Sequence, residues 1–269
     1  MHLIVTRSFP PEVGGMQNLM WGLANSLSKH KLIKVFADNY DRCLEFDKKL
    51  SYTIERVSGP KFIRKYRKAY LVNEFIKENS KIECIITDHW KSLELIKTNK
   101  KKICLIHSKE INHPKNSRIY NRIIKVLNDA HFIVANSEYT KNLAVENGVS
   151  NKNIIVINPG VYPASPIENK IIKDAEILLK GKNPRLITVS RYDKRKNHEK
   201  IIMALRNLKQ IYPNIIYVSV GYGEEEENIR KLVNELGLEN HVIFQKNISQ
   251  ELKNALISKS DLFVMPSII

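Results

Sequence analysis

The chain has 269 residues, which is enough for two domains of ordinary size. Hydrophobic residues make up 43% of it, so we expect buried cores and exclude a disordered chain. The formal net charge is +16, of which +12 falls in residues 1–162 (27 Lys and Arg against 15 Asp and Glu) and +4 in the remainder (17 against 13). This asymmetry indicates either an anionic partner of the first half or a compositional bias toward lysine.

No apolar stretch approaches the roughly 18 residues of a membrane-spanning helix, and the N-terminus lacks the pattern of a signal peptide. Cys43, Cys84 and Cys104 show no CxxC spacing, so buried thiols in a reducing cytoplasm are the simplest interpretation. Outside 61–70, basic residues are not interleaved with stacking aromatics, and no nucleic-acid reading module is present, so no nucleic-acid partner is expected.

Short apolar, β-branched runs alternate with stretches of helical period. In the first half the expected helices are 16–29, 64–78, 117–128 and 137–147, and the expected strands are "HLIVT" (2–6), "IKVFA" (33–37), "IECIIT" (82–87), "KICLIH" (102–107), "HFIVA" (131–135) and "NIIVI" (153–157). Continuously apolar strands separated by helices predict a parallel sheet covered on both faces.

The same alternation restarts at residue 185. The expected strands are 185–190, 215–220, 241–245 and 261–265, separated by helices near 197–210, 224–236 and 250–258. We therefore expect two doubly wound domains, 1–160 and 185–269, joined by a linker over 161–184. The second domain offers four strands where about six are common, and the chain stops just past the fourth, so we expect this domain to be incomplete.

Ligands of open α/β sheets bind beyond the carboxyl ends of the strands, so we consider the residues that follow each strand. Gly14 and Gly15 precede a helix whose free N–H groups can receive an anion, although an ordinary tight turn is the alternative. Their spacing matches neither GxGxxG nor GxxxxGK[ST]. His107 ends the run "KICLIH", and His89 follows "IITD" as a weaker example. A histidine there can position a reacting group, or it is simply a polar residue at a strand end.

Basic residues crowd the turn after "RLITVS" in "VSRYDKRKNHEKII" (189–202). Arg191 lies one residue past the strand, and Lys196 precedes Asn197, a plausible helix cap. A guanidinium, an ammonium and a helix N-terminus together suit a diphosphate, whereas a solvated basic loop is the alternative. Gly221 and Gly223 open another helix in "GYGEEEE", which alone is a weak signal.

In this order, these features resemble the retaining GT-B glycosyltransferases, in particular glycosyltransferase family 4 (glycosyl transferases group 1). The matching segments are "PPEVGGMQ", "LIHS", "NPGV", "VSRYDKRKNHEKIIMAL", "GYGEEEENIRKL" and "ALISKSDLFVMPS". The resemblance implies an α/β GT-B fold of two Rossmann-like domains that face a cleft, with the acceptor on the first domain and the nucleotide-sugar donor mostly on the second. It also implies sugar transfer with retention of configuration, in polysaccharide or lipopolysaccharide biosynthesis.

The resemblance assigns roles to residues of this sequence. Arg191 and Lys196 correspond to the family's cation pair on the donor diphosphate, which stabilises charge on the leaving group. His107 corresponds to the cleft histidine near the donor sugar and is the catalytic candidate. Gly14 and Gly15 correspond to the loop that admits the donor.

Gly221 and Gly223 fall in the donor-side loop that the resemblance implies. The sequence has no DxD motif, which fits the metal-independent chemistry of the family, so neither a metal nor a cofactor is expected beyond the donor substrate. The family's acidic–Gly–Phe–Gly segment, which follows "MPS", is absent because the chain ends at Ile269. We therefore expect a truncation at the C-terminus.

The segment "KFIRKYRKAYLVNEFIKEN" (61–79) begins basic and aromatic and continues as an amphipathic helix. Arg64, Lys65, Arg67 and Lys68 are candidates for a surface that holds an anionic lipid-linked acceptor or rests on an anionic membrane, as a peripheral protein does. The alternative is a solvated helix face.

Three classes of function remain open. The first is sugar transfer from a nucleotide sugar to a glycan or lipid-linked acceptor. The second is a nucleotide-sugar epimerase of the same architecture, which alone would isomerise the donor without an acceptor. The third is a truncated, non-catalytic protein that binds a nucleotide or a partner.

Overall fold

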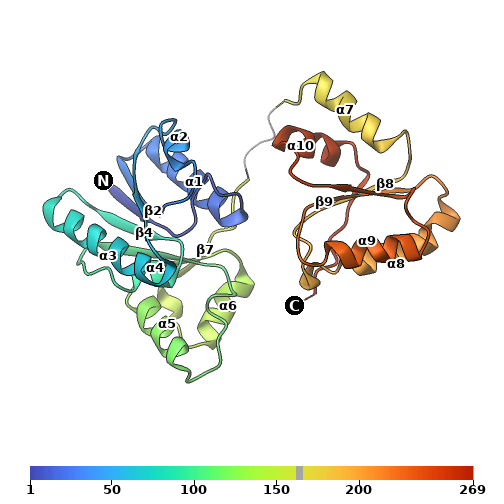
Figure 1. The fold of residues 1–269 in the computed structure, drawn as a ribbon. Coiled ribbons are helices and arrows are strands. Elements are labelled where there is room, and N and C mark those ends of the chain that lie inside the picture. The colour runs from blue at the N-terminus through green and yellow to red at the C-terminus, as the bar shows by residue number, and fades with distance from the viewer. Residues whose placement is uncertain (162–165, 269) are drawn as a thin grey trace. The chain divides into compact units, whose positions relative to one another are not determined.

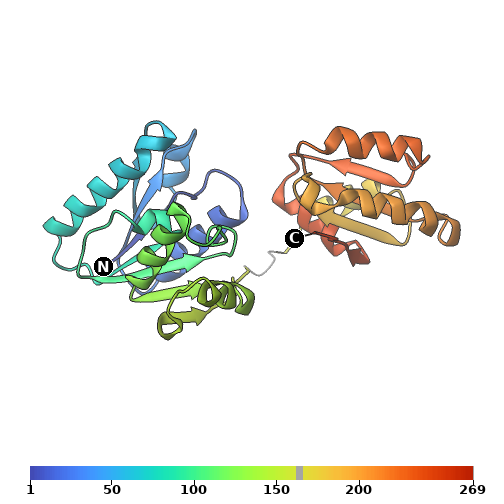
Figure 2. The same cartoon turned by 90° about the horizontal axis from the view of Figure 1, so that it is seen from below.

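The chain forms two compact units. The computed structural model describes residues 1–161 and 166–268, and the chain divides into Met1–Val161 and Tyr162–Ile269. In each unit a parallel sheet lies between helices, which Figure 1 shows from one side and Figure 2 after a turn of 90°. The alternation of apolar runs and helical stretches in the sequence predicted this α/β architecture.

The sheet formed by residues 1–161 has seven parallel strands in the order β3-β2-β1-β4-β5-β6-β7. They are β1 (His2–Val5), β2 (Ile33–Asp38), β3 (Thr53–Val57), β4 (Cys84–Thr87), β5 (Lys101–Ile106), β6 (Phe132–Ala135) and β7 (Ile154–Val156). The strand order reverses between β1 and β4, where His2 pairs with Cys84. Ligands of open α/β sheets usually bind at such a switch point, beyond the carboxyl ends of the strands.

Helices cover both faces of this sheet. α1 (Gly15–Ser28) buries Met20 in a cluster with Ile4, and α3 (Lys61–Glu78) buries Val72 in a cluster with Leu3. Successive side chains of a strand point to opposite faces, so these two helices lie on opposite sides of β1. The remaining helices of the unit are α2 (Cys43–Asp47), α4 (Trp90–Leu93), α5 (Arg118–Asn128), α6 (Glu138–Glu146) and the 3₁₀ turn η1 (Asn151–Asn153).

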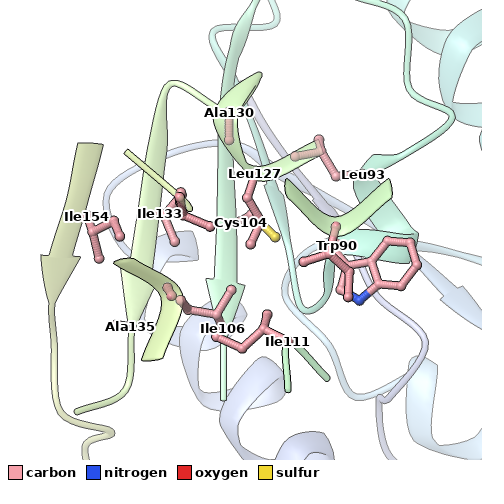
Figure 3. Close-up of a cluster of buried hydrophobic side chains, with 13 residues drawn as sticks. Trp90, Leu93, Cys104, Ile106, Ile111, Leu127, Ala130, Ile133, Ala135 and Ile154 are labelled. Carbon is pink, nitrogen blue, oxygen red and sulfur yellow. The ribbon is translucent and has the colours of Figure 1, made fainter. Parts of the chain in front are cut away.

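A buried cluster lies between β5, β6 and the helices α4 to α6 (Figure 3). Trp90 is fully buried in it beside Cys104 and Ile106 of β5. The indole Nε1 of Trp90 also donates a hydrogen bond of 3.0 Å to the carbonyl of Glu110. This contact ties α4 to the segment that follows β5, where His107 lies.

Within residues 166–268, four parallel strands form a sheet in the order β10-β9-β8-β11. They are β8 (Arg185–Val189), β9 (Ile216–Val220), β10 (Val242–Gln245) and β11 (Leu262–Phe263). α7 (Asn169–Leu179) and α10 (Gln250–Ser258) cover one face, and α8 (His198–Ile211) and α9 (Glu226–Glu235) cover the other (Figure 1). The 3₁₀ turn η2 (Lys194–Lys196) precedes α8.

The linker predicted over 161–184 differs from the structure. α7 lies inside this range, and its Ala175 and Leu179 are fully buried in a cluster with Ala255 and Leu256 of α10. The helix therefore belongs to the second unit, because its apolar stripe covers one face of that unit's sheet.

The three cysteines, Cys43, Cys84 and Cys104, all lie in the first unit, and each is a buried free thiol. Burial raises the pKa of Cys84 to about 11 and that of Cys104 to about 12. Both groups are therefore uncharged thiols at neutral pH, as expected for cysteines that fill a core.

Candidate functional site

The basic turn of the second unit connects β8 to α8. The side chain of Arg191 is 73% exposed, and its Nη2 lies 3.7 Å from Oδ2 of Asp193. Asp193 also fixes the turn, since its Oδ1 accepts a hydrogen bond of 3.1 Å from the backbone N–H of Lys196. Asn197 occupies the cap position of α8 in a left-handed conformation, without a side-chain cap bond. The turn therefore presents cations to solvent at the carboxyl end of β8.

The loop that contains Gly221 and Gly223 packs against this turn. A Cβ atom on Gly221 would lie 1.9 Å from the carbonyl oxygen of Ser190, and one on Gly223 would lie 2.3 Å from the carbonyl oxygen of Tyr192. The backbone N–H of Tyr192 donates to the carbonyl of Tyr222 at 2.9 Å. The two glycines thus allow the loop after β9 to pack directly on the backbone that carries Arg191.

A buried histidine lies beneath the same turn. Nε2 of His198 lies 2.9 Å from Oγ of Ser190, and Nδ1 lies 3.2 Å from the hydroxyl of Tyr217. Burial lowers the pKa of His198, so the ring is neutral near pH 7 and bridges the two hydroxyl groups. His198 stands inside the basic motif of the sequence, but the sequence pattern did not reveal this role.

A cavity of about 470 Å³ opens beside the starts of α8 and α9. Its lining includes Asp193, Glu199, Glu225 and Glu235 against two lysines, and it does not include Arg191 or Lys196. Carboxylates outnumber lysines in this lining and repel an anion, so the cavity is unsuited to a diphosphate.

In the first unit, α1 begins at Gly15 with Gly14 at its cap position. No side chain caps this end, and its first turn carries no acidic residue. A Cβ atom on Gly14 would approach only the flexible side chain of Gln17, and one on Gly15 would meet nothing within 4 Å. The start of α1 therefore has open space in front of N–H groups that side chains leave free.

His107 directly follows β5 and is half-buried. Its backbone N–H donates to a carboxylate oxygen of Glu110, and its Nε2 is buried with no hydrogen-bond partner among the described residues. The next residue, Ser108, has a φ of +82°, a conformation that non-glycine residues rarely adopt. The backbone at His107 is thus fixed by Glu110, and the buried Nε2 of its ring is without a partner among the described residues.

A second group of polar residues lies beside β1 and β4. Nδ1 of His89 accepts a hydrogen bond of 2.9 Å from the backbone N–H of Lys91. Burial lowers the pKa of His89 to about 2, and the nearby charges of Arg7, Lys91 and His107 add to this effect. Arg7 was not singled out from the sequence, although it follows β1 almost at once, and its Nε is buried with no partner among the described residues.

The basic residues of α3 do not form one exposed surface. Lys68 is only 3% exposed, because its ammonium donates to the carbonyl of Thr6 and pairs with Asp38. Arg64 also pairs with Asp38, at 3.0 Å. Lys65 is half-buried, and Arg67 is exposed with a 2.9 Å hydrogen bond to the carbonyl of Ser58. The expectation that all four share one surface is therefore corrected for Lys68.

The predicted site residues thus fall into two groups, one in each unit. Arg191, Lys196, Gly221 and Gly223 lie together around the ends of β8 and β9, whereas Gly14, Gly15 and His107 follow β1 and β5. Among the described residues, no group of three or more His, Cys, Asp or Glu side chains is arranged to hold a metal ion. No helix in the same part of the chain is long and apolar enough to cross a bilayer.

Two family models match the chain. "Glycosyltransferase Family 4" matches residues 13–165, and "Glycosyl transferases group 1" matches residues 169–269. The chain is 23% identical to a GDP-mannose-dependent alpha-(1-6)-phosphatidylinositol monomannoside mannosyltransferase of Mycolicibacterium smegmatis, over 98% of this chain and 72% of the relative. It is 34% identical to an uncharacterized glycosyltransferase of Methanocaldococcus jannaschii, over 57% of this chain and 39% of that protein.

Solved structures with the same fold include Anabaena Alr3699/HepE in complex with UDP and a glycosyltransferase of Rickettsia africae. The alignment with the first has a TM-score of 0.79 at 19% identity, and it covers 100% of this chain and 74% of the HepE chain. The alignment with the second has a TM-score of 0.78 at 20% identity, and it covers 99% of this chain and 73% of the Rickettsia chain. The fold is therefore GT-B, as the resemblance implied. With a family 4 model over the first unit and a group 1 model over the second, the chain belongs to the family 4 glycosyltransferases.

Proposed function

We propose that the chain transfers a hexose from a nucleotide diphosphate sugar to a glycan or lipid-linked acceptor, with retention of configuration. The main observation that supports this proposal is the basic turn after β8. Arg191 is exposed there with only a long contact to Asp193, and the Gly221–Gly223 loop and His198 support the turn from two sides. Such a turn is prepared to receive an anion with little rearrangement.

Arg191 and Lys196 would bind the donor diphosphate. When the bond between the sugar C1 and the phosphate oxygen breaks, negative charge grows on that oxygen, and the two cations stabilise it. A bond then forms between C1 and an acceptor oxygen, and the acceptor proton is released. Because fixed cations stabilise the leaving group, we propose that this step needs no metal ion. In this scheme Gly14 and Gly15 admit the donor at the start of α1.

His107 is proposed to contact the donor sugar as the catalytic histidine. Its unused Nε2 supports this role, because a buried ring nitrogen without a partner is costly and is readily satisfied by a ligand hydroxyl. The named relatives use or bind different nucleotides, GDP-mannose in one case and UDP in another. UDP and GDP are therefore both candidates for the donor nucleotide.

Titration calorimetry of the full chain with UDP, GDP and the matching nucleosides tests the diphosphate site. We expect Arg191→Ala and Lys196→Ala each to weaken binding of the preferred nucleotide diphosphate by about 10- to 100-fold, since each removes a charge-assisted contact. Nucleoside binding should change less than twofold. Lys200→Ala, an exposed lysine of α8, is the matched control. Unchanged diphosphate affinity in both variants would remove the assignment.

The product anomer, read by NMR with a fluorescent or lipid-linked acceptor, tests retention. Addition of EDTA should leave the rate unchanged if the chemistry is metal-independent. Incubation with donor alone separates transfer from epimerisation, because an isomerised nucleotide sugar would favour the epimerase.

We further propose that α3 rests on an anionic membrane surface. Phe62, Tyr66 and Tyr70 are 72%, 56% and 65% exposed, and their spacing of four residues places them on one stripe of the helix. Lys61 and Arg67 are exposed beside this stripe. Aromatic rings flanked by cations are typical of helices that lie in a membrane interface. The apolar residues Leu71 and Phe75, further along α3, pack on the sheet instead.

A further inference from the structure

A small cationic pocket lies at the switch point of the first sheet. It holds about 50 Å³ and is bordered by the carboxyl ends of β1 and β2, by α4 after β4 and by the first turns of α3. Asp38 is the carboxylate among its lining residues, whereas its cationic lining consists of Arg7, Lys61, Arg64, Lys65, Lys68 and Lys91. We call this the cationic pocket. Its place at the end of a parallel sheet is where ligands of such sheets bind.

The carboxylates of the first unit do not neutralise this pocket. Asp38 is shared between Arg64 and Lys68. Lys65 reaches Glu94 only at 4.0 Å, and Glu94 already binds Arg122 through two hydrogen bonds of 2.6 and 2.7 Å.

Asp88 is buried nearby, but its oxygens are engaged as well. They accept from the backbone N–H of Arg7 at 3.0 Å and from the hydroxyl of Ser92 at 2.7 Å. Among the described residues, the side chains of Arg7, Lys61 and Lys91 have no ion pair. The pocket therefore keeps an excess of three unpaired cations.

Two further observations indicate that these cations suit an anionic ligand. Nε of Arg7 is buried without a hydrogen-bond partner, although a guanidinium donor is normally paired when water is excluded. Burial lowers the pKa of Lys91, and the neighbouring charges of Arg7, Arg122 and Lys65 lower it further. Mutual repulsion of this kind is relieved when an anion enters.

We propose that the cationic pocket binds a phosphate group of the acceptor, so that the natural acceptor is phosphorylated. This inference rests on the proposed glycosyltransferase function. A phosphate carries up to two negative charges and three acceptor oxygens, which match Arg7, Lys61 and Lys91 better than a single carboxylate does. The small volume accommodates one phosphoryl group and not a nucleotide, and the donor diphosphate has its own basic turn in the second unit.

The phosphate can belong to a soluble sugar phosphate or to a lipid headgroup, and two arms of one experiment distinguish these sources. In the first arm, glycerol 3-phosphate and glycerol are titrated into the full chain and followed by NMR. In the second arm, vesicles of phosphatidylcholine with and without phosphatidic acid are floated with the chain. The variants are Lys61→Gln, an exposed residue whose replacement does not disturb the core, and Lys91→Gln. Lys125→Gln, an exposed lysine of α5, is the matched control.

We expect glycerol 3-phosphate to bind and glycerol not to bind. Each pocket variant should lose about tenfold or more in phosphate affinity, while the control stays at the parent value. A loss of vesicle binding in Lys91→Gln, which lies in α4 and outside the exposed stripe of α3, would assign the phosphate to a lipid. Unchanged flotation of this variant would assign it to a soluble acceptor. Equal binding of glycerol and glycerol 3-phosphate, or unchanged affinity in both variants, would overturn the proposal.

The affinity for UDP and GDP is measured in the same samples. It should not change in Lys61→Gln or Lys91→Gln, and a comparable loss there would overturn the proposal by placing the pocket in the donor site. If neither nucleotide binds the parent chain while glycerol 3-phosphate does, the proposed transferase function fails and the phosphate site stands.

Discussion

At the scale of single residues, close backbone approach decides which side chains the loop after β9 tolerates beside the basic turn. The loop after β9 lies so near Ser190 and Tyr192 that any Cβ atom on Gly221 or Gly223 would collide with a carbonyl oxygen. Both neighbours are backbone atoms, which move only if the turn itself moves. The sequence showed only a GxG, and the reason for the glycines became visible once the two loops were placed against each other.

Gly221→Ala should therefore lower both stability and nucleotide affinity. We expect a loss of about 2–4 kcal/mol in the free energy of unfolding, typical of overpacking combined with a displaced backbone. Gly181→Ala is the control, because its Cβ would meet nothing within 4 Å and only its φ of +63° opposes the change. The free energy of unfolding of that control should fall by about 1 kcal/mol. Chemical unfolding and UDP or GDP titration of both variants measure the difference, and equal losses would contradict the account.

His89 should make the protein sensitive to acid. Its pKa falls from 6.5 to about 2 in the folded chain. Below pH 6.5 the imidazole of His89 therefore binds a proton in the unfolded chain and stays neutral in the folded chain. The stability that its neutral form contributes is present above pH 6.5, decreases by about 1.4 kcal/mol per pH unit below it, and is lost by about pH 2.

His89→Asn keeps an acceptor for the N–H of Lys91 and removes the titrating ring. Between pH 7 and pH 5, we expect the parent to lose about 2 kcal/mol more than this variant in the free energy of unfolding. The exposed His30→Asn variant should follow the parent curve. Parallel curves for all three proteins would show that His89 does not titrate as described.

At the scale of elements, the helices and strands that bury an apolar stripe were predictable and the rest were not. The sequence does not predict β3, because "TIERV" has only two apolar residues and lies at the edge of the sheet, where Val57 is its one buried residue. α2 and α4 span five and four residues, too short for a helical period to show. α7 falls in the range assigned to the linker, because a sequence does not tell which sheet a helix covers.

Candidate site residues can be read from local order along the chain. The residues that follow the strands include Gly14, His107 and Arg191, whose roles stay predictions. The cationic pocket was missed because Arg7 and Lys91 meet only when β1 pairs with β4, and that pairing brings together segments about 80 residues apart.

α3 is the element whose exposed stripe can be tested directly. We expect Tyr66→Ser combined with Phe62→Ser to reduce recovery with anionic vesicles several-fold, because two interfacial aromatic rings are lost. Tyr139→Ser on α6 removes an equally exposed ring from another helix of the same unit and should leave recovery unchanged. Equal recovery of the parent chain with neutral and anionic vesicles would count against the membrane contact.

At the scale of the whole molecule, each unit has its own buried clusters. We expect a cavity in one unit to loosen that unit alone. Leu205→Ala removes a fully buried side chain of α8 and should lower the free energy of unfolding by about 2–5 kcal/mol. Hydrogen exchange should then accelerate in residues 166–268 and stay unchanged in residues 1–161. Leu127→Ala, fully buried in α5, should give the opposite pattern. Uniform acceleration in either variant would mean that the units unfold together.

The distribution of the cysteines makes thiol labelling a measure of opening in the first unit. All three thiols are buried in the first unit, and the second unit has none. The thiolate and not the thiol attacks an alkylating reagent, and pKa values of about 11 and 12 keep Cys84 and Cys104 protonated while the fold is closed. Labelling therefore requires the first unit to open. The rate of mass gain with a thiol reagent would record how often the first unit opens in unmodified protein. If that unit binds a phosphorylated acceptor as proposed, the bound acceptor would lower this rate.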